Sequence, residues 1–204
     1  MAWAYDVAGN TASQIVLIDI GNGPPQGSGS GKAIWQMLPN GVVSKPATVK
    51  LSASDPEGDA ITATLANMVN GYVESFDPNN LIFLFQPYLS NELACEAVRN
   101  RDIVKGGFSV ILQDSCGAES VVWVPVEIEV RDKVPPVITL PPDVDLGCHC
   151  SRPDTSPDAT GWAQATDSCD PNPVITYEDT ETVEGEVHTI TRTWRATDGC
   201  GNSA

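Results

Sequence analysis

The chain of 204 residues is poor in positive charge, in histidine and in long apolar runs. It carries 11 Lys and Arg against 27 Asp and Glu, for a formal net charge of −16, and only two His. Nucleic acid and anionic membrane surfaces would repel so acidic a protein, so we expect neither as a partner. No stretch is long and apolar enough to span a membrane, and no signal peptide or lipidation motif is present. We therefore expect no membrane insertion, and either the chain is a mature or excised segment or its export depends on something outside this sequence.

The scarcity of histidine also argues against hydrolytic catalysis. His149 lies between two cysteines, and His188 lies in a run of alternating threonines. Neither is accompanied by a nucleophile elbow, and paired carboxylates carry little information in a chain this acidic. We predict that the protein is not an enzyme.

Turn-forming and β-branched residues are abundant instead. The 17 Gly and 16 Pro separate short runs rich in Val, Ile and Thr, and only Glu92–Asn100 indicates a helical turn. The pattern predicts an all-β fold. The expected strands are Thr48–Ala53, Ile61–Leu65, Leu81–Phe85, Phe108–Leu112 and Val121–Val130, followed by Asp143–Leu146, Thr160–Ala165, Val174–Tyr177 and His188–Ala196.

One short signature occurs three times, at Asp6–Ala12, Asp114–Ser120 and Asp198–Ala204. An apolar strand follows the first two copies but not the third, and repetition at this spacing indicates successive small β-sandwiches. We interpret each copy as the turn of a domain's last hairpin, in which turn geometry alone explains the Asp. The predicted organisation is a closing hairpin or donor strand at 1–20, a Gly/Pro/Ser linker at 21–32, a β-sandwich at 33–132 and a β-sandwich lacking its final strand at 133–204.

The chain resembles two families of extracellular modules. Residues 33–132 resemble bacterial cadherin-like tandem repeats, in the turn Ser54–Thr62 and in the hairpin formed by Phe108–Asp114 and Val124–Val130. Residues 134–204 look like the hyalin-repeat (HYR) class, and residues 1–20 look like the end of another such domain. The resemblance implies tandem immunoglobulin-like sandwiches that serve adhesion or cell-surface structure. The HYR motifs are Pro135–Thr139, Thr160–Asp170, Ile175–Thr180 and Thr191–Asn202.

Six cysteines beside turn residues fit structural disulfides, so we expect an extracellular or cell-surface location. The HYR resemblance implies a bond between Cys169 and Cys200, and analogy of position gives Cys95 to Cys116. The remaining pair, Cys148 and Cys150, is interpreted as forming disulfides within or between chains. A zinc site at Cys148-His149-Cys150 is the alternative, but it lacks a visible fourth ligand. The family tends to bond a cysteine here to its final strand, where this chain has Gln14.

The acidic turn Asp55–Asp59 places Asp55, Glu57 and Asp59 within five residues, and carboxylates at this spacing suit Ca²⁺. It is not an EF-hand, because Ala60 and Ala66 replace the loop glycine and the bidentate glutamate. The alternative is a solvated Asp turn. We expect no other cofactor. O-linked glycans are compatible with Pro/Gly-rich stretches that contain Ser28, Ser30, Thr155, Ser156 and Thr160.

The leading hypothesis is a structural subunit of an extracellular filament, joined to copies of itself. An open sandwich exposes a sheet edge that the N-terminal strand of the next copy can fill, and such head-to-tail contacts produce open polymers. The polymer interface would be Ile15, Val16, Leu17, Ile18 and Ile20.

Two other sources of the strand stay open. The chain is alternatively an excised segment of a long adhesin that binds glycan or protein ligands, with neighbouring immunoglobulin-like domains supplying the strand. In the third case the chain's own N-terminal strand folds back. About twelve linker residues would then reach only ~40 Å when fully extended, which is less than the separation expected for two domains in line.

Overall fold

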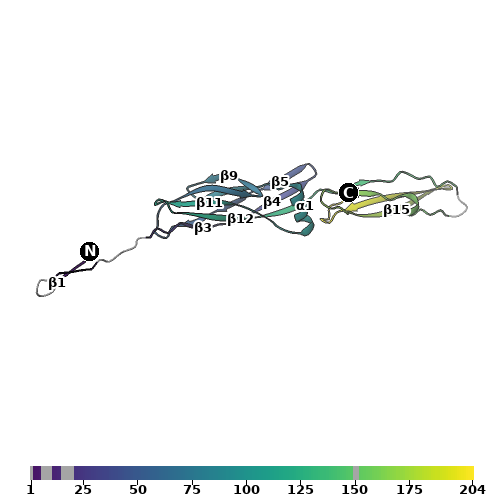
Figure 1. Cartoon of the computed structure of the whole chain (residues 1–204). Coiled ribbons are helices and arrows are strands. Elements are labelled where there is room, and N and C mark those ends of the chain that lie inside the picture. The colour runs from purple at the N-terminus through teal and green to yellow at the C-terminus, as the bar shows by residue number, and fades with distance from the viewer. Residues whose placement is uncertain (1, 6–10, 15–20, 149–151) are drawn as a thin grey trace.

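The computed structural model describes residues 2–5, 11–14, 21–148 and 152–204, and strands make up most of it. The prediction of an all-β chain is therefore confirmed. A larger body (residues 22–134) and a smaller body (residues 135–204) lie end to end (Figure 1). Among the described residues, no helix has the length and apolarity needed to cross a membrane.

The larger body is a sandwich of a five-stranded and a three-stranded sheet. A small third sheet pairs β3 (Gln26–Ser28) with β7 (Ser52–Ser54). In spatial order the first sheet contains β5 (Gly41–Lys45), β4 (Gly31–Leu38), β12 (Glu119–Asp132), β11 (Val104–Asp114) and β8 (Ile61–Val69), and the second contains β6 (Ala47–Lys50), β10 (Ile82–Pro87) and β9 (Gly71–Asp77).

Alternating apolar residues of both sheets form the core of the larger body. Phe83 and Phe85 of β10 pack against Phe108 of β11, with ring centroids 4.9 and 6.0 Å away, and all three are fully buried. On β12, Val126 and Ile128 face this core. Pro125 lies just before the residues of β12 that pair with β4, so its missing N–H costs no ladder bond on that side.

Helix α1 (Asn91–Asn100) replaces the single helical turn expected at this point. The hydroxyl of Ser90 accepts a hydrogen bond from Leu93 N (3.2 Å), and Arg101 ends the helix in the left-handed conformation. The buried face includes Cys95. The helix lies at the end of the larger body that meets the smaller one (Figure 1).

The predicted linker 21–32 is wrong over most of its length, because β3 and the start of β4 fall inside it. Its glycines allow close packing: a Cβ on Gly27 would lie 2.9 Å from Leu112 Cδ1, and one on Gly31 would lie 2.6 Å from Val49 Cγ2. Residues 21–25 remain as the connection, and Pro25 is fully buried.

The smaller body consists of two separate pairs of strands. β13 (Val137–Thr139) pairs with β14 (Gln164–Thr166), and β15 (Val174–Glu184) pairs with β16 (Val187–Thr197). The short helix α2 (Pro157–Thr160) includes the first residue of the strand predicted at Thr160–Ala165. The strand predicted at Asp143–Leu146 is wrong, since these residues form no ladder.

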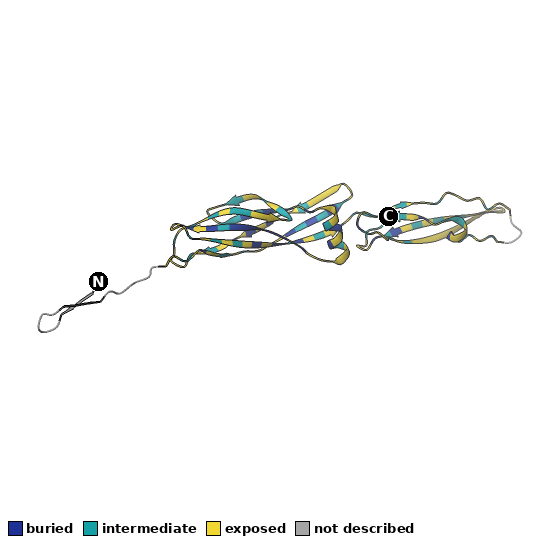
Figure 2. Cartoon of the chain, viewed as in Figure 1, coloured by how far each residue is buried: buried dark blue, intermediate teal, exposed yellow. Residues whose placement is uncertain are grey.

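Very little of the smaller body is buried. Apart from prolines, only Ala163, Cys169 and Ala196 among its described apolar side chains are buried, whereas the larger body contains most of the buried residues (Figure 2). A sandwich stabilised by apolar burial is therefore complete in the larger body and incomplete in the smaller one.

Candidate functional site

The repeated signature folds into the same turn in both bodies. Asp114 Oδ1 accepts hydrogen bonds from the backbone N–H of Cys116 and Ala118 (both 2.9 Å), and Asp198 Oδ1 accepts them from Cys200 and Asn202 (2.9 and 2.8 Å). Both turns contain a glycine with positive φ, as only glycine adopts readily. Turn geometry thus accounts for the Asp. The turn at 6–10, including Asp6, lies outside the described residues.

All three hairpins that contain the signature pair in the same register. The residue before the Asp pairs with the residue five positions after the Asp: Tyr5 with Thr11, Gln113 with Glu119, and Thr197 with Ser203. The third hairpin continues for one more residue, because Ala196 and Ala204 exchange two backbone hydrogen bonds of 3.0 Å. A strand that completes the third hairpin would therefore continue from Ala204 along the edge of β16.

The outer edge of β16 is open beyond that point. Among the described residues, β15 is its only partner strand from Arg195 to Val187. In the larger body the equivalent place is occupied by β12, which pairs with β11 over ten residue pairs. Such an edge presents unpaired N–H and C=O groups that can bind another strand.

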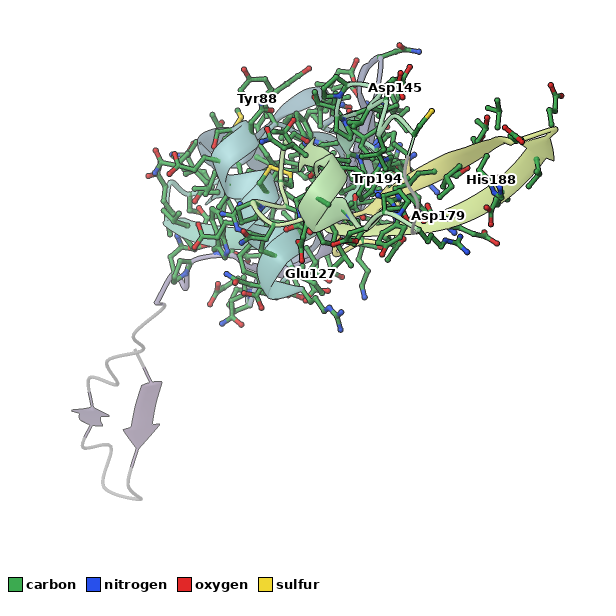
Figure 3. All side chains as sticks on the ribbon, turned by 90° about the vertical axis from the view of Figure 1, so that its right-hand side faces the viewer. Tyr88, Glu127, Asp145, Asp179, His188 and Trp194 are labelled. Atoms are coloured by element: carbon green, nitrogen blue, oxygen red, sulfur yellow. A yellow bond between two sulfur atoms is a disulfide. The ribbon has the colours of Figure 1, made fainter. Side chains whose placement is uncertain are left out.

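The inner face of the β15–β16 hairpin carries a partly exposed aromatic cluster. Trp162, Tyr177 and Trp194 lie with ring centroids 5.3 to 6.1 Å apart, and Trp162 is 51% exposed. Figure 3 shows the hairpin extending away from the rest of the molecule, with Trp194 and Asp179 near its base and His188 further toward its tip. In a complete sandwich this face is covered by apolar side chains of further strands.

The residues predicted to fill the edge are Ile15, Val16, Leu17, Ile18 and Ile20, and they lie outside the described residues. Only the strand that leads into them, β2 (Thr11–Gln14), is described, and it pairs with β1 (Ala2–Tyr5).

The predicted calcium ligands Asp55, Glu57 and Asp59 each accept hydrogen bonds from the protein. Asp55 Oδ1 binds Glu57 N and Asp59 N (2.9 and 3.0 Å), as in an Asp turn. Glu57 Oε2 accepts from Gly23 N (3.1 Å), and Asp59 Oδ1 from Ser115 Oγ (3.2 Å). In the part of the chain that the structure describes, the three do not form a close carboxylate group, so calcium here stays a prediction.

A different carboxylate group lies where the two bodies meet. Asp132 ends β12, Asp167 follows β14 and Asp198 follows β16, and one oxygen from each lies within 4.8 Å of the others. Asp132 is 4% exposed and Asp198 7%. Burial raises the pKa of Asp132, and the nearby charges of Asp167 and Asp198 raise it further. The backbone hydrogen bond from Val134 lowers this pKa but does not cancel the rise.

Sequence reasoning missed this group because its members are far apart in the chain. In the sequence, the turn alone accounts for Asp198. The available signal was that Asp132, Asp167 and Asp198 each come directly after, or end, a strand. Only the strand order shows that those strand ends meet.

The structure joins Cys95 to Cys169, so the predicted bonds Cys95–Cys116 and Cys169–Cys200 are wrong. Cys95 lies on α1, before β11 begins, whereas Cys116 lies after β11 ends, and an 11-residue strand spans ~36 Å. The bond links the two bodies, and Arg99 Nη1 donates to Cys169 O (3.1 Å) beside it. Both cysteines are buried. A disulfide of this kind is typical of proteins in non-reducing compartments.

The other described cysteines, Cys116, Cys148 and Cys200, are free thiols. Burial raises the pKa of Cys200, and the charges of Asp132, Asp198 and Asp167 raise it further. The charge of Asp59 raises the pKa of Cys116. Both thiols are thereby kept protonated and poorly nucleophilic. Cys150 and His149 lie outside the described residues, so neither pairing nor zinc binding there is tested.

A scan against protein-family models and a search of curated proteins found no match to this chain.

Proposed function

We propose that the protein is a structural subunit of an extracellular filament or stalk, in which immunoglobulin-like sandwiches are joined head to tail by strand complementation. The observation that carries the proposal is the open edge of β16, along which pairing has already begun at Ala204. The partner is a second copy of this chain. The extracellular location is supported by the buried disulfide.

The shared register specifies how the donor strand would fit. In the larger body, Val124, Val126 and Ile128 of β12 are fully buried, and they pair beside Phe108, Gly106 and Val104. The residues at the same distances in sequence after the Asp of the N-terminal signature are Val16, Ile18 and Ile20. In the proposed complex they would lie beside Arg192, Ile190 and His188 of the copy that accepts the strand. Burying each aliphatic side chain would contribute about 1.5–3 kcal/mol before the cost of association. Leu17, at the place of the exposed Pro125, would face outward.

The direction of the donor strand favours a linear polymer. A strand continuing the pairing at Ala204 runs along β16 away from the junction. Residues 21–25 would then lead straight into the larger body of the next copy, just as β12 leads through Pro135-Pro136 into the smaller body. A head-to-tail contact of this kind does not close on itself.

Completion by the chain's own N-terminus is disfavoured by distance. The connection 21–25 reaches ~17 Å. Pro25 is held beside the start of β12 by a hydrogen bond from Ser120, and β12 rises ~40 Å from there to Asp132. The donor would have to span that length before reaching β16.

One observation favours a second candidate, a segment of a long cell-surface adhesin whose neighbouring domains supply the strand. β1 and β2 already pair in the closing-hairpin register, so residues 15–20 would complete the domain that contains Ala2–Tyr5. In the shared register, Thr11 and Ala12 correspond to Ser203 and Ala204. A strand donated to another copy would therefore have to leave β1, so the β1–β2 hairpin would have to open.

Light scattering after size-exclusion chromatography of the full chain separates the two candidates. Strand complementation predicts a concentration-dependent series of oligomers for the native chain. Ile18→Asp should shift the chain to monomer, because the charge would enter the core, whereas the matched control Leu17→Asp should still polymerise. A folded native chain that stays monomeric at high concentration would support the adhesin segment, and equal effects of the two substitutions would contradict the proposed register.

A further inference from the structure

Two exposed thiols lie in different bodies, far apart in the same chain. Cys116 lies in the turn between β11 and β12 of the larger body, and Cys148 belongs to the smaller body. β12 rises ~40 Å from this turn to Asp132, where the two bodies meet. A bond between Cys116 and Cys148 of one chain is therefore excluded by distance, so such a bond could only join two copies.

Cys148 is tethered to the outer part of the β15–β16 hairpin. Four residues further on, Arg152 Nη2 forms a 3.1 Å ion pair with Glu181 Oε2, and Glu181 Oε1 lies 2.8 Å from His188 Nδ1. Glu181 follows Val174, at the junction end of the hairpin, by seven positions, which is ~23 Å along the strand. Four residues reach at most ~14 Å, so Cys148 cannot return to the junction.

The proposed strand complementation brings the two thiols to the same contact between copies. In its register, Ile20 of the donating copy lies beside His188 of the accepting copy. Two residues after Ile20, Asn22 Nδ2 donates to Asp114 Oδ2 (3.0 Å), and Asp114 opens the turn that contains Cys116. The closing turn of the donating copy is thereby placed near the hairpin segment of the accepting copy to which its exposed thiol is tethered.

The chain already closes one contact between successive bodies with a disulfide. Cys95 of the larger body is bonded to Cys169 of the smaller body across the junction. The contact between copies would be the next junction along a filament. It likewise joins the far end of one body to the closing-turn end of the next, and each side carries an exposed free thiol.

We propose that Cys116 of one copy forms a disulfide with Cys148 of the copy that accepts its N-terminal strand, so that a covalent bond closes each contact of the filament. This inference rests on the strand complementation proposed above. The bond forms by exchange with a small disulfide oxidant. Each protein thiol loses one proton and one electron, and the S–S bond of the oxidant breaks to give two thiols.

The surroundings of Cys116 favour this reaction in the filament over reaction in the free chain. Its Sγ lies 3.6 Å from Asp59 Oδ2, and the charge of Asp59 raises the pKa of Cys116. The thiolate is the reactive form, so Cys116 of a free chain reacts slowly with oxidants. In the filament the donated strand holds the two thiols near each other, and this raised effective concentration favours the bond between copies.

The test compares polymer formation with covalent cross-linking in the full chain. The native chain is first polymerised with a mild reductant present and followed by light scattering, and the reductant is then replaced by oxidised glutathione. Non-reducing gel electrophoresis in detergent should show a ladder of multimers that returns to monomer on reduction. Peptide mapping by mass spectrometry should find Cys116 bonded to Cys148.

Serine variants identify the two partners. Cys116→Ser and Cys148→Ser should each polymerise normally by light scattering. Each should lower the cross-linked fraction by about tenfold or more, because only the pair held together in the filament reacts at a raised effective concentration. The matched control Cys200→Ser should leave the ladder unchanged. A 1:1 mixture of Cys116→Ser and Cys148→Ser should give cross-linked dimers and nothing larger, because only one kind of contact then contains both thiols.

The outcomes separate this bond from the strand complementation on which it rests. A polymer that scatters light but stays monomeric on the gel after oxidation would overturn the bond and leave strand complementation intact. A ladder that persists in Cys148→Ser but disappears in Cys150→Ser would overturn it by assigning the partner to Cys150. A native chain that forms no polymer before oxidation would contradict strand complementation itself, and the bond with it.

Discussion

Arg192 is a charged residue at a position where the larger body has a core aromatic, Phe108. Its guanidinium forms hydrogen bonds of 2.7 and 2.8 Å with the two carboxylate oxygens of Asp179, and it lies 4.5 Å above the ring of Tyr177. It also donates to Thr160 Oγ1 (3.0 Å). The inner face of the smaller body is therefore stabilised partly by charge, which suits a face that is still partly exposed.

This pair predicts a pH dependence of stability. The hydrogen bonds and charge of Arg192 lower the pKa of Asp179 in the folded chain. A carboxyl whose pKa is lower in the folded state contributes stability above its unfolded pKa of about 3.9, and the contribution is lost as the pH falls through the folded pKa. Asp179→Asn should therefore melt at a lower temperature than the native chain at pH 7, and the difference should shrink toward zero at the acid end.

Thermal melts from pH 7 to pH 2 measure this difference. The exposed Asp143→Asn is the control, because the structure gives its carboxylate no ion pair. A difference between native chain and Asp179→Asn that stays constant over the whole range would contradict the proposed role of the ion pair.

Single residues were predictable from sequence where the interaction is local. In the two closing turns that the structure describes, Asp114 and Asp198 accept hydrogen bonds from backbone N–H groups two and four residues further on, so the signature itself contains the whole interaction. Cys95 and Cys169 were paired wrongly because 74 residues separate them and the order of strands decides which cysteines meet.

At the scale of elements, the glycine-rich stretch gives the clearest difference between sequence and structure. Composition cannot separate a glycine that provides flexibility from one that permits close packing. Gly31 belongs to the second class, because Val49 Cγ2 occupies the space of a Cβ, whereas Gly21 has no atom within 4 Å of that position. The strands with clear apolar alternation, such as β10, β11 and β12, were predicted near their true positions. β9 was missed, because none of its residues is fully buried and its apolar pattern is weak.

A pair of glycine substitutions tests this assignment. Gly31→Ala should destabilise the chain by about 1–3 kcal/mol, because the added methyl group overpacks the contact with Val49. Gly21→Ala should leave the free energy of unfolding within about 0.5 kcal/mol. Urea denaturation measures both. Equal and small effects would mean that residues 26–32 are a flexible linker after all.

At the scale of the whole molecule, the two bodies differ in completeness while they share their closing turn. The larger body buries a full set of core residues, and the smaller one exposes both an edge and an aromatic face (Figure 2). The all-β architecture could be predicted from the short β-branched runs between turn residues, and the open edge of β16 from the repeated signature. The Cys95–Cys169 bond and the carboxylate group at the junction could not, because both depend on how the bodies meet.

Mixing two complementary variants of the full chain tests head-to-tail completion most directly. Ile18→Asp should block donation but leave β16 open, whereas Ile190→Asp should block the acceptor face but leave the donor strand intact. Each variant alone should be monomeric by light scattering, and a 1:1 mixture should form a dimer of twice the chain mass and nothing larger. A mixture that stays monomeric under conditions in which the native chain polymerises, or a native chain that never polymerises, would contradict strand complementation between copies.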